Sequence, residues 1–158
     1  MRLLFIVLSV LIDCLAFVPQ KSKELSINLK YVTTEKSKDS YSITETWKLE
    51  KNTLTFSYVN TNKRKTIAPK TVAAKLTASD LDSLVKIIRK NELLVNVPAE
   101  KRNEYAVPYT AIGVTLSITA GQEKGSISLY ALKNAMGANV YYRHVEKLRS
   151  AMRKFIKE

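Results

Sequence analysis

The residue types that most often perform catalysis or bind metals are rare in this chain. His144 is the only histidine and Cys14 is the only cysteine among 158 residues. Zinc and copper sites draw mostly on these two residue types, so the sequence predicts no transition-metal site and no cofactor. A general base would also need a nucleophile and an orienting acid, and no motif supplies them near His144. We therefore expect His144 to be a partly exposed residue on a helix surface.

Two pairs of closely spaced carboxylates are the remaining candidates for acid–base chemistry. Asp80 and Asp82 lie at the start of a predicted helix, where capping and the helix dipole explain them. Glu100 and Glu104 lie in a predicted surface loop, where solvated charge explains them. A hydrolase that uses these loop carboxylates stays open as an alternative, and it predicts loss of turnover in Glu100→Gln or Glu104→Gln. No glycine-rich phosphate loop is present, and the sequence predicts a protein that is not an enzyme.

Two short clusters are candidates for binding. The first is the basic turn Asn62-Lys63-Arg64-Lys65. It suits an anionic polymer or partner but is equally typical of a solvated hairpin tip. The second is a loop around residues 99–109, where tyrosines beside basic residues could anchor an interface or pack beneath the loop. The candidate partner-binding residues are Lys63, Arg64, Lys65, Lys101, Arg102, Tyr105 and Tyr109.

The net charge of +12 favours contact with something anionic. Nineteen of the 26 basic residues are lysines and seven are arginines. Specific base and phosphate readout relies mostly on the planar guanidinium group of arginine, so this bias argues against a specific nucleic-acid ligand. A lysine-rich, solvated surface without any ligand explains the same charge, and the sequence leaves both interpretations open.

The first residues have the pattern of a signal peptide. Arg2 precedes an apolar run over residues 3–12, and Ala16 provides a small residue at a cleavage position. We therefore predict a signal peptide over residues 1–16. Asp13 interrupts the pattern and argues against lipidation of the following cysteine.

Export would leave a mature chain without cysteine. We predict a linker over residues 17–24 and a single domain over residues 25–158. Removal of Cys14 with the signal peptide would leave a disulfide-free domain, which is typical of bacterial exported proteins. The expected location is the periplasm, the cell envelope or the exterior.

Two amphipathic helices are predicted. The first starts at Thr77, which together with Asp80 makes a capping box, and it stops in an apolar exit before Pro98. The second starts at Asn139, a plausible N-cap, and carries basic residues on its outer side. The apolar positions that keep helical spacing are Leu81, Leu84, Val85 and Ile88 in the first helix, and Tyr141, Val145, Leu148, Met152 and Phe155 in the second.

Alternating apolar and polar residues predict the strands. Pro69 excludes the strand-prone stretch 66–75 from a central place in a sheet. Glu45 interrupts an apolar face, and we expect it near the end of the sheet. The loops are expected at residues 33–40 and 133–138. The predicted strands are residues 25–31, a hairpin of 41–49 and 54–58, and a second hairpin of 112–118 and 127–131 turning at 121–125.

The order of strands, helix, hairpin and helix predicts an α+β domain. We expect an antiparallel sheet of about five or six strands packed on the two helices. The sequence leaves open whether the first strand joins this sheet or swaps onto a neighbouring molecule. Because the sheet needs the apolar face of the closing helix, we expect neither a membrane-lying helix nor a transmembrane segment in the mature chain.

Residues 76–84 have the pattern LT-x-x-D-L-x-x-L, and the apolar exit, the second hairpin and the basic closing helix follow it. This order of elements resembles that of a known group of domains. It is similar to small exported bacterial domains of unknown function, whose layout also resembles the emfourin-type inhibitors of thermolysin-like metalloproteases. The resemblance covers about residues 41–156 and implies a non-enzymatic domain that binds or inhibits another exported protein such as a protease. The exit Leu93-Leu94-Val95 is aliphatic where those domains often carry aromatic residues, and no inhibitory residue can be assigned. The alternative is an envelope protein that binds an anionic polymer through its basic surface.

Overall fold

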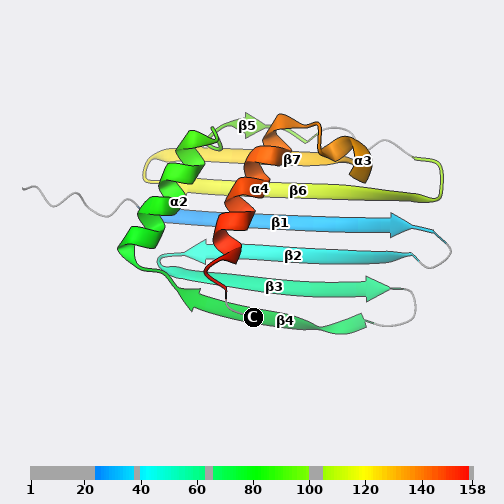
Figure 1. Ribbon diagram of the computed structural model, residues 1–158, viewed down its shortest axis with the longest axis horizontal. Helices are drawn as coiled ribbons and strands as arrows, with labels where there is room; N and C mark the ends of the chain where they lie inside the picture. Colours follow the sequence, from blue (N-terminus) through cyan, green and yellow to red (C-terminus); the bar gives the residue numbers. More distant parts are fainter. Residues whose placement is uncertain (1–23, 38–39, 63–65, 100–104, 157–158) are drawn as a thin grey trace, which may run out of the picture.

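The fold is a two-layer arrangement of one sheet and a layer of helices (Figure 1). The computed structural model describes residues 24–37, 40–62, 66–99 and 105–156, without the side chains of residues 66–69. The predicted signal peptide, Cys14 and most of the predicted linker lie outside the described residues. The elements are β1 (Leu25–Lys36), β2 (Tyr41–Glu50), β3 (Thr53–Asn62), β4 (Thr66–Lys75), α2 (Ala78–Lys90), β5 (Asn96–Val97), β6 (Tyr109–Ala120), β7 (Glu123–Leu132), α3 (Lys133–Met136) and α4 (Val140–Arg153).

The sheet has seven strands in the order β4-β3-β2-β1-β6-β7-β5. All neighbours are antiparallel except β5 and β7, which are parallel. The first strand, β1, lies in the centre of this sheet and pairs with β2 and β6 of its own chain. The predicted α+β class is confirmed. The count of elements differs in detail, because the two-residue β5 and the four-residue α3 are too short for a periodic pattern.

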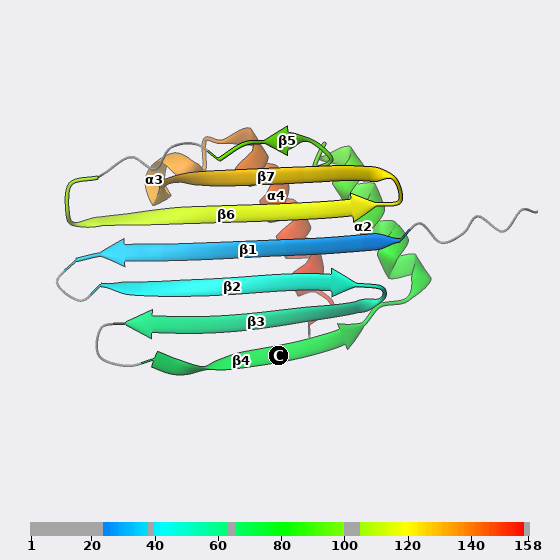
Figure 2. The ribbon, with the colours of Figure 1, turned by 180° about the vertical axis from the view of Figure 1, so that it is seen from behind.

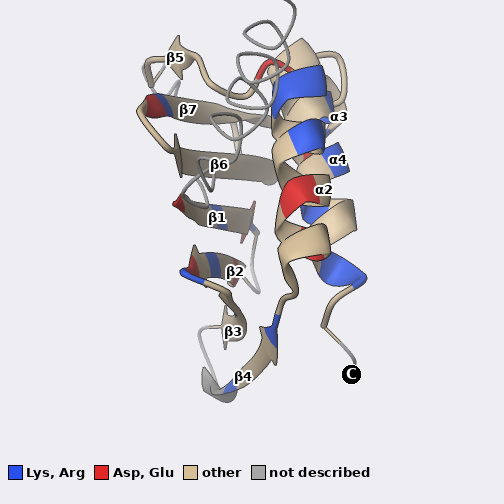
Figure 3. Cartoon of the chain, turned by 90° about the vertical axis from the view of Figure 1, so that its left-hand side faces the viewer, with Lys and Arg blue, Asp and Glu red and all other residues tan. Residues whose placement is uncertain are grey.

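The hydrophobic core lies between the sheet and the helices α2 and α4, which cover the same face (Figure 3). In the middle of the sheet, Leu29 is paired with Trp47 on one side and with Leu116 on the other. All three are buried, as are Leu84 of α2 and Leu148 of α4. The alternation of the strands and the 3.6-residue period of the helices bring their apolar faces into one layer.

Local capping signals fix where both long helices begin. The Thr77 hydroxyl accepts a hydrogen bond from the Asp80 amide at 3.2 Å, and the Asp80 carboxylate accepts one from the Thr77 amide at 2.8 Å. The predicted capping box is therefore confirmed. The Asn139 side chain accepts a hydrogen bond from the Tyr142 amide at 3.1 Å, which confirms the predicted cap of α4.

Several predicted boundaries are wrong. β1 extends to Lys36 into the predicted loop, because it pairs along its whole length with β6. β7 begins at Glu123, so Gly125 lies within a strand rather than in the turn. Lys133–Met136 forms the short helix α3 where a loop was expected. The prediction that Pro69 belongs to an edge is confirmed, since β4 is the outermost strand.

The opposite face of the sheet carries no helix in the described part of the chain (Figure 2). Side chains that point away from the core on neighbouring strands line up in rows, because antiparallel partners share a face. The two rows across the middle are mostly hydroxyl, amide and lysine side chains. They are Thr55, Lys48, Asn28, Ser117 and Ser126, and then Ser57, Thr46, Lys30, Thr115 and Ser128.

Candidate functional site

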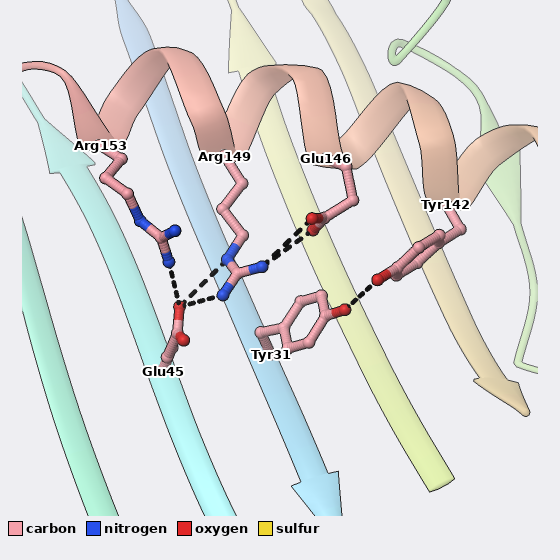
Figure 4. Close-up of polar contacts among 6 residues, drawn as sticks. All are labelled: Tyr31, Glu45, Tyr142, Glu146, Arg149 and Arg153. Atoms are coloured by element: carbon pink, nitrogen blue, oxygen red, sulfur yellow. Dashed lines mark hydrogen bonds and ion pairs between the residues drawn. The ribbon is translucent and has the colours of Figure 1, made fainter. Parts of the chain in front are cut away.

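A cluster of charged side chains lies between the sheet and α4 (Figure 4). Arg149 donates from Nη2 to Glu45 Oε2 at 2.6 Å and from Nε to the same oxygen at 3.0 Å. Its Nη1 donates to both carboxylate oxygens of Glu146 at 3.2 Å. The Arg149 and Glu45 side chains are only 14% and 15% exposed, while Arg153 contacts Glu45 more loosely at 3.6 Å.

Two tyrosines extend this cluster toward the first turn of α4. The Arg149 guanidinium lies over the Tyr31 ring, 4.3 Å from its centroid, which is favourable cation–π geometry. The Tyr31 hydroxyl shares a hydrogen bond with the Tyr142 hydroxyl. Burial, and then the hydrogen bond with Tyr142, raises the pKa of Tyr31 well above its usual value. Tyr31 therefore stays protonated and acts as a neutral hydrogen-bonding group.

This cluster attaches α4 to the middle of the sheet. The expectation that Glu45 lies near a sheet end is wrong: it is paired with Tyr31 on one side and with Tyr58 on the other. It breaks the apolar face because it meets Arg149, which is 104 positions later in the chain. Both carboxylates are occupied by guanidinium groups and the cluster contains no nucleophile, so its arrangement fits a structural role.

The described candidates for acid–base chemistry are Asp80 and Asp82 on α2 and His144 on α4. His144 is half-buried on α4, and its ring meets the Tyr141 ring edge-on, with 6.5 Å between the ring centroids. The His144 Nδ1 atom is buried and has no hydrogen-bond partner among the described residues. Hydrogen bonds from Thr77 lower the pKa of Asp80, which serves as the helix cap. Glu100 and Glu104 lie outside the described residues. Within the described ranges, no three histidine, cysteine, aspartate or glutamate side chains form a group that could hold a metal ion.

A basic groove runs between α2 and α4. It has a volume of about 490 Å³, and Lys90, Lys147 and Lys154 line it together with the apolar side chains of Ile87 and Ala151. None of the three lysines forms an ion pair with a described residue. Glu146 also lines the groove, but its carboxylate is bound by Arg149. The groove therefore has an excess of positive charge that no described residue neutralises.

The tertiary fold creates this groove from two basic residues of the predicted closing helix, Lys147 and Lys154, and from Lys90 of the other long helix. Lys147 and Lys154 are seven residues apart, two turns or about 10 Å along the helix axis, so they share a face of α4. That spacing is a signal that the sequence does contain. Lys90 lies on α2, and only the packing of the two helices brings it to the same groove. We call this surface the lysine groove.

Only part of the two predicted binding clusters lies within the described residues. Lys63, Arg64, Lys65, Lys101 and Arg102 lie outside the described residues. Tyr105 and Tyr109 are half-buried, and their ring centroids lie 5.4 Å apart in an edge-on contact. The Tyr105 ring also stacks on the Tyr130 ring, with 6.4 Å between the centroids. This geometry fits the interpretation that the two tyrosines pack beneath the loop rather than anchor an interface.

Val107, in the same loop, is a strongly exposed apolar residue. Its relative exposure is 68%, and it borders a depression of about 530 Å³ at the end of the sheet. Ser42, Thr61 and Asn62 are among the polar residues that line this depression. Asn62, at the start of the predicted basic turn, and Val107, in the predicted loop of residues 99–109, therefore border the same depression.

Comparisons with known proteins found no family model that matches this chain and no curated protein that matches its sequence. The resemblance to emfourin-type inhibitors therefore stays an expectation. Among the described helices, none combines the length and the apolar character that a membrane span requires.

Proposed function

We propose that this protein is an exported, non-enzymatic binding domain that holds an anionic polymer in the lysine groove. The observation that carries the proposal is the presence of Lys90, Lys147 and Lys154 in one open groove, without a partner carboxylate among the described residues. Positive side chains without counter-charges attract anionic ligands, and the net charge of +12 adds a long-range attraction.

The composition of the groove favours a polymer with repeated carboxylate or phosphate groups. Lysine acts as a flexible point charge, which suits repeated anionic groups without a fixed geometry, whereas stereospecific recognition prefers arginine. Lysine and arginine positions recur along the helix layer (Figure 3), so the wider field reinforces the groove. An acidic polysaccharide of a cell envelope has this chemistry.

Replacing Lys90, Lys147 and Lys154 together with glutamine is expected to weaken binding to polygalacturonate and to reduce its salt dependence. Each contact between a lysine and an anionic group releases counterions, so the slope of log affinity against log salt concentration should fall in magnitude by about 2 to 3. The measurement is fluorescence anisotropy of labelled polygalacturonate over a range of salt concentrations. Polyphosphate serves as a second probe and distinguishes phosphate from carboxylate preference.

A matched control removes the same charge from the other side of the molecule. Lys30, Lys75 and Lys124 are exposed, and strand register places them on the helix-free face. Their triple glutamine variant should keep most of the affinity and salt slope. Equal losses in both triple variants would show that the net charge, not the groove, attracts the polymer. Absence of binding to either polymer at low salt would overturn the proposal.

The second candidate function is binding to another exported protein, as the resemblance implies. The observation that favours it is the exposed Val107 beside the packed Tyr105, Tyr109 and Tyr130. An apolar side chain on a loop supported by packed rings is a plausible interface anchor.

Titration of a thermolysin-like protease with the purified protein tests the inhibitor version. Inhibition that saturates near equimolar ratio, and that weakens by about tenfold or more in Val107→Asp, is the expected result, because a buried charge at an anchor is costly. Val140→Asp is the control, since Val140 is also exposed but lies on α4. Unchanged protease activity at molar excess would exclude the inhibitor version of this function.

A further inference from the structure

A second cavity lies on the helix-bearing face, beyond the C-terminal end of α4. β3 and β4 extend past the area that the two long helices cover (Figure 1). The cavity between them and the end of α4 has a volume of about 290 Å³ and is lined by Glu45, Trp47, Phe56, Tyr58, Lys70, Val72, Arg153 and Ile156. We call it the aromatic cleft. It shares no lining residue with the lysine groove.

Strand register divides the floor of the cleft into an apolar row and a polar row. Trp47, Phe56 and Val72 are paired across β2, β3 and β4, and the Trp47 and Phe56 rings lie 4.3 Å apart. The adjacent row is Glu45, Tyr58 and Lys70, paired across the same strands. The cleft thus has an apolar side and a charged side, the arrangement of sites that hold amphipathic small molecules.

The charges around the cleft do not balance. Glu45 and Glu146 face three cations, Arg149, Arg153 and Lys70, which leaves an excess of one positive charge. Arg149 is saturated by the two carboxylates, whereas Arg153 is 59% exposed and only 3.6 Å from Glu45. Lys70 is exposed and forms no ion pair with a described residue. One anionic group between Lys70 and Arg153 would neutralise this excess.

Trp47, which lines the cleft, also has a hydrogen-bond donor without an acceptor among the described residues. Trp47 is only 1% exposed, and its Nε1 is buried without an acceptor among the described residues. Buried N–H groups are nearly always paired, so this donor is uncommon.

We propose that the aromatic cleft binds a small amphipathic carboxylate. Its apolar body lies on the row of Trp47, Phe56 and Val72, and its carboxylate lies between Lys70 and Arg153. The small volume of the cleft favours a single ring or a short alkyl chain. This site is independent of the polymer proposed for the lysine groove.

Trp47 is the only tryptophan of the chain, so its fluorescence reports directly on the cleft. Titration of the purified protein with octanoate should give a saturable change in the emission of Trp47. The uncharged 1-octanol should bind at least about fivefold more weakly, because it lacks the charge that Lys70 and Arg153 attract. The cationic octylamine should not bind.

Two kinds of variant separate this site from general attraction to a basic protein. Lys70→Gln should weaken octanoate binding by about fivefold, and it leaves the core intact because Lys70 is exposed. Val72→Phe should fill the apolar row and abolish the fluorescence change. Lys147→Gln, which removes the same charge from the lysine groove, should leave octanoate affinity unchanged.

Equal affinity for octanoate and octanol, or equal weakening by Lys70→Gln and Lys147→Gln, would overturn the proposed anionic site. Absence of any saturable change in Trp47 emission would overturn the cleft as a ligand site altogether. Failure of polygalacturonate binding would affect only the lysine groove, because the two experiments use different ligands and different variants.

Discussion

Replacing Arg149 with methionine is expected to lower the free energy of unfolding by about 3 kcal/mol. The variant keeps the apolar stem but leaves Glu45, which is 15% exposed, without its hydrogen-bonded partner at 2.6 Å. The Glu45 carboxylate would keep only its looser contact with Arg153, at 3.6 Å, which offsets little of the cost of desolvation. Urea denaturation followed by far-ultraviolet circular dichroism measures the loss, and the denaturant slope should stay unchanged.

Arg143→Met is the matched control. Arg143 lies on the same helix and is exposed, and its guanidinium only donates to the carbonyl oxygens of Gly137 and Ala138, at 3.2 and 2.9 Å. Its loss should cost about 1 kcal/mol or less. Equal destabilisation by Arg149→Met and Arg143→Met would show that the buried ion pairs do not hold α4 on the sheet.

The double variant Glu45→Met with Arg149→Met separates two free energies: the net contribution of the ion pair to stability, and the cost of removing only one partner. Replacing both charged partners with apolar side chains removes the uncompensated charge, so the double variant should be more stable than Arg149→Met alone. The expected coupling energy is about 1 to 3 kcal/mol. Additive losses would contradict a direct interaction between the two side chains.

Local signals explain which parts of the fold were predictable. The Thr77 and Asp80 capping box and the Asn139 cap each act within three residues, so the sequence reports them directly. The alternation in β1, β2, β3, β6 and β7 likewise reflects one buried face. Pro69 correctly indicated an edge strand, since it has no N–H to donate to a neighbour.

The features that sequence analysis missed depend on partners distant in the chain. Glu45 looked like an interruption of a strand because Arg149 lies 104 positions away. The lysine groove needs Lys90 beside Lys147, which no periodicity within one helix can indicate. The aromatic cleft depends on the register of three strands, and alternation reveals which face a residue takes but not which residue lies opposite it.

Gly125→Ala is expected to be the second strongly destabilising substitution, with a loss of about 3 kcal/mol. Gly125 lies in β7, paired with Ile118, and the chain that leaves α2 passes directly over it. A Cβ atom here would lie 2.7 Å from the Leu94 Cα and still closer to the carbonyl oxygen of Leu93. Both neighbours are backbone atoms, so relief requires moving the segment that carries the buried Leu93. The urea midpoint measures the loss.

Gly113→Ala is the matched control, because it makes the same substitution in a strand where no backbone atom lies close to the new Cβ atom. Gly113 also lies in a strand, but the nearest atom to its new Cβ would be Tyr130 Cδ2 at 3.5 Å, an ordinary van der Waals contact. Alanine is less flexible than glycine in the unfolded chain, so Gly113→Ala should be neutral or stabilising by about 0.5 kcal/mol. The hydrogen bond from the Ser126 amide to the Val95 carbonyl, 2.8 Å long, also holds the passing segment against β7. If Gly125→Ala were as stable as Gly113→Ala, residues 93–95 could not pack against β7 as closely as the structure has them.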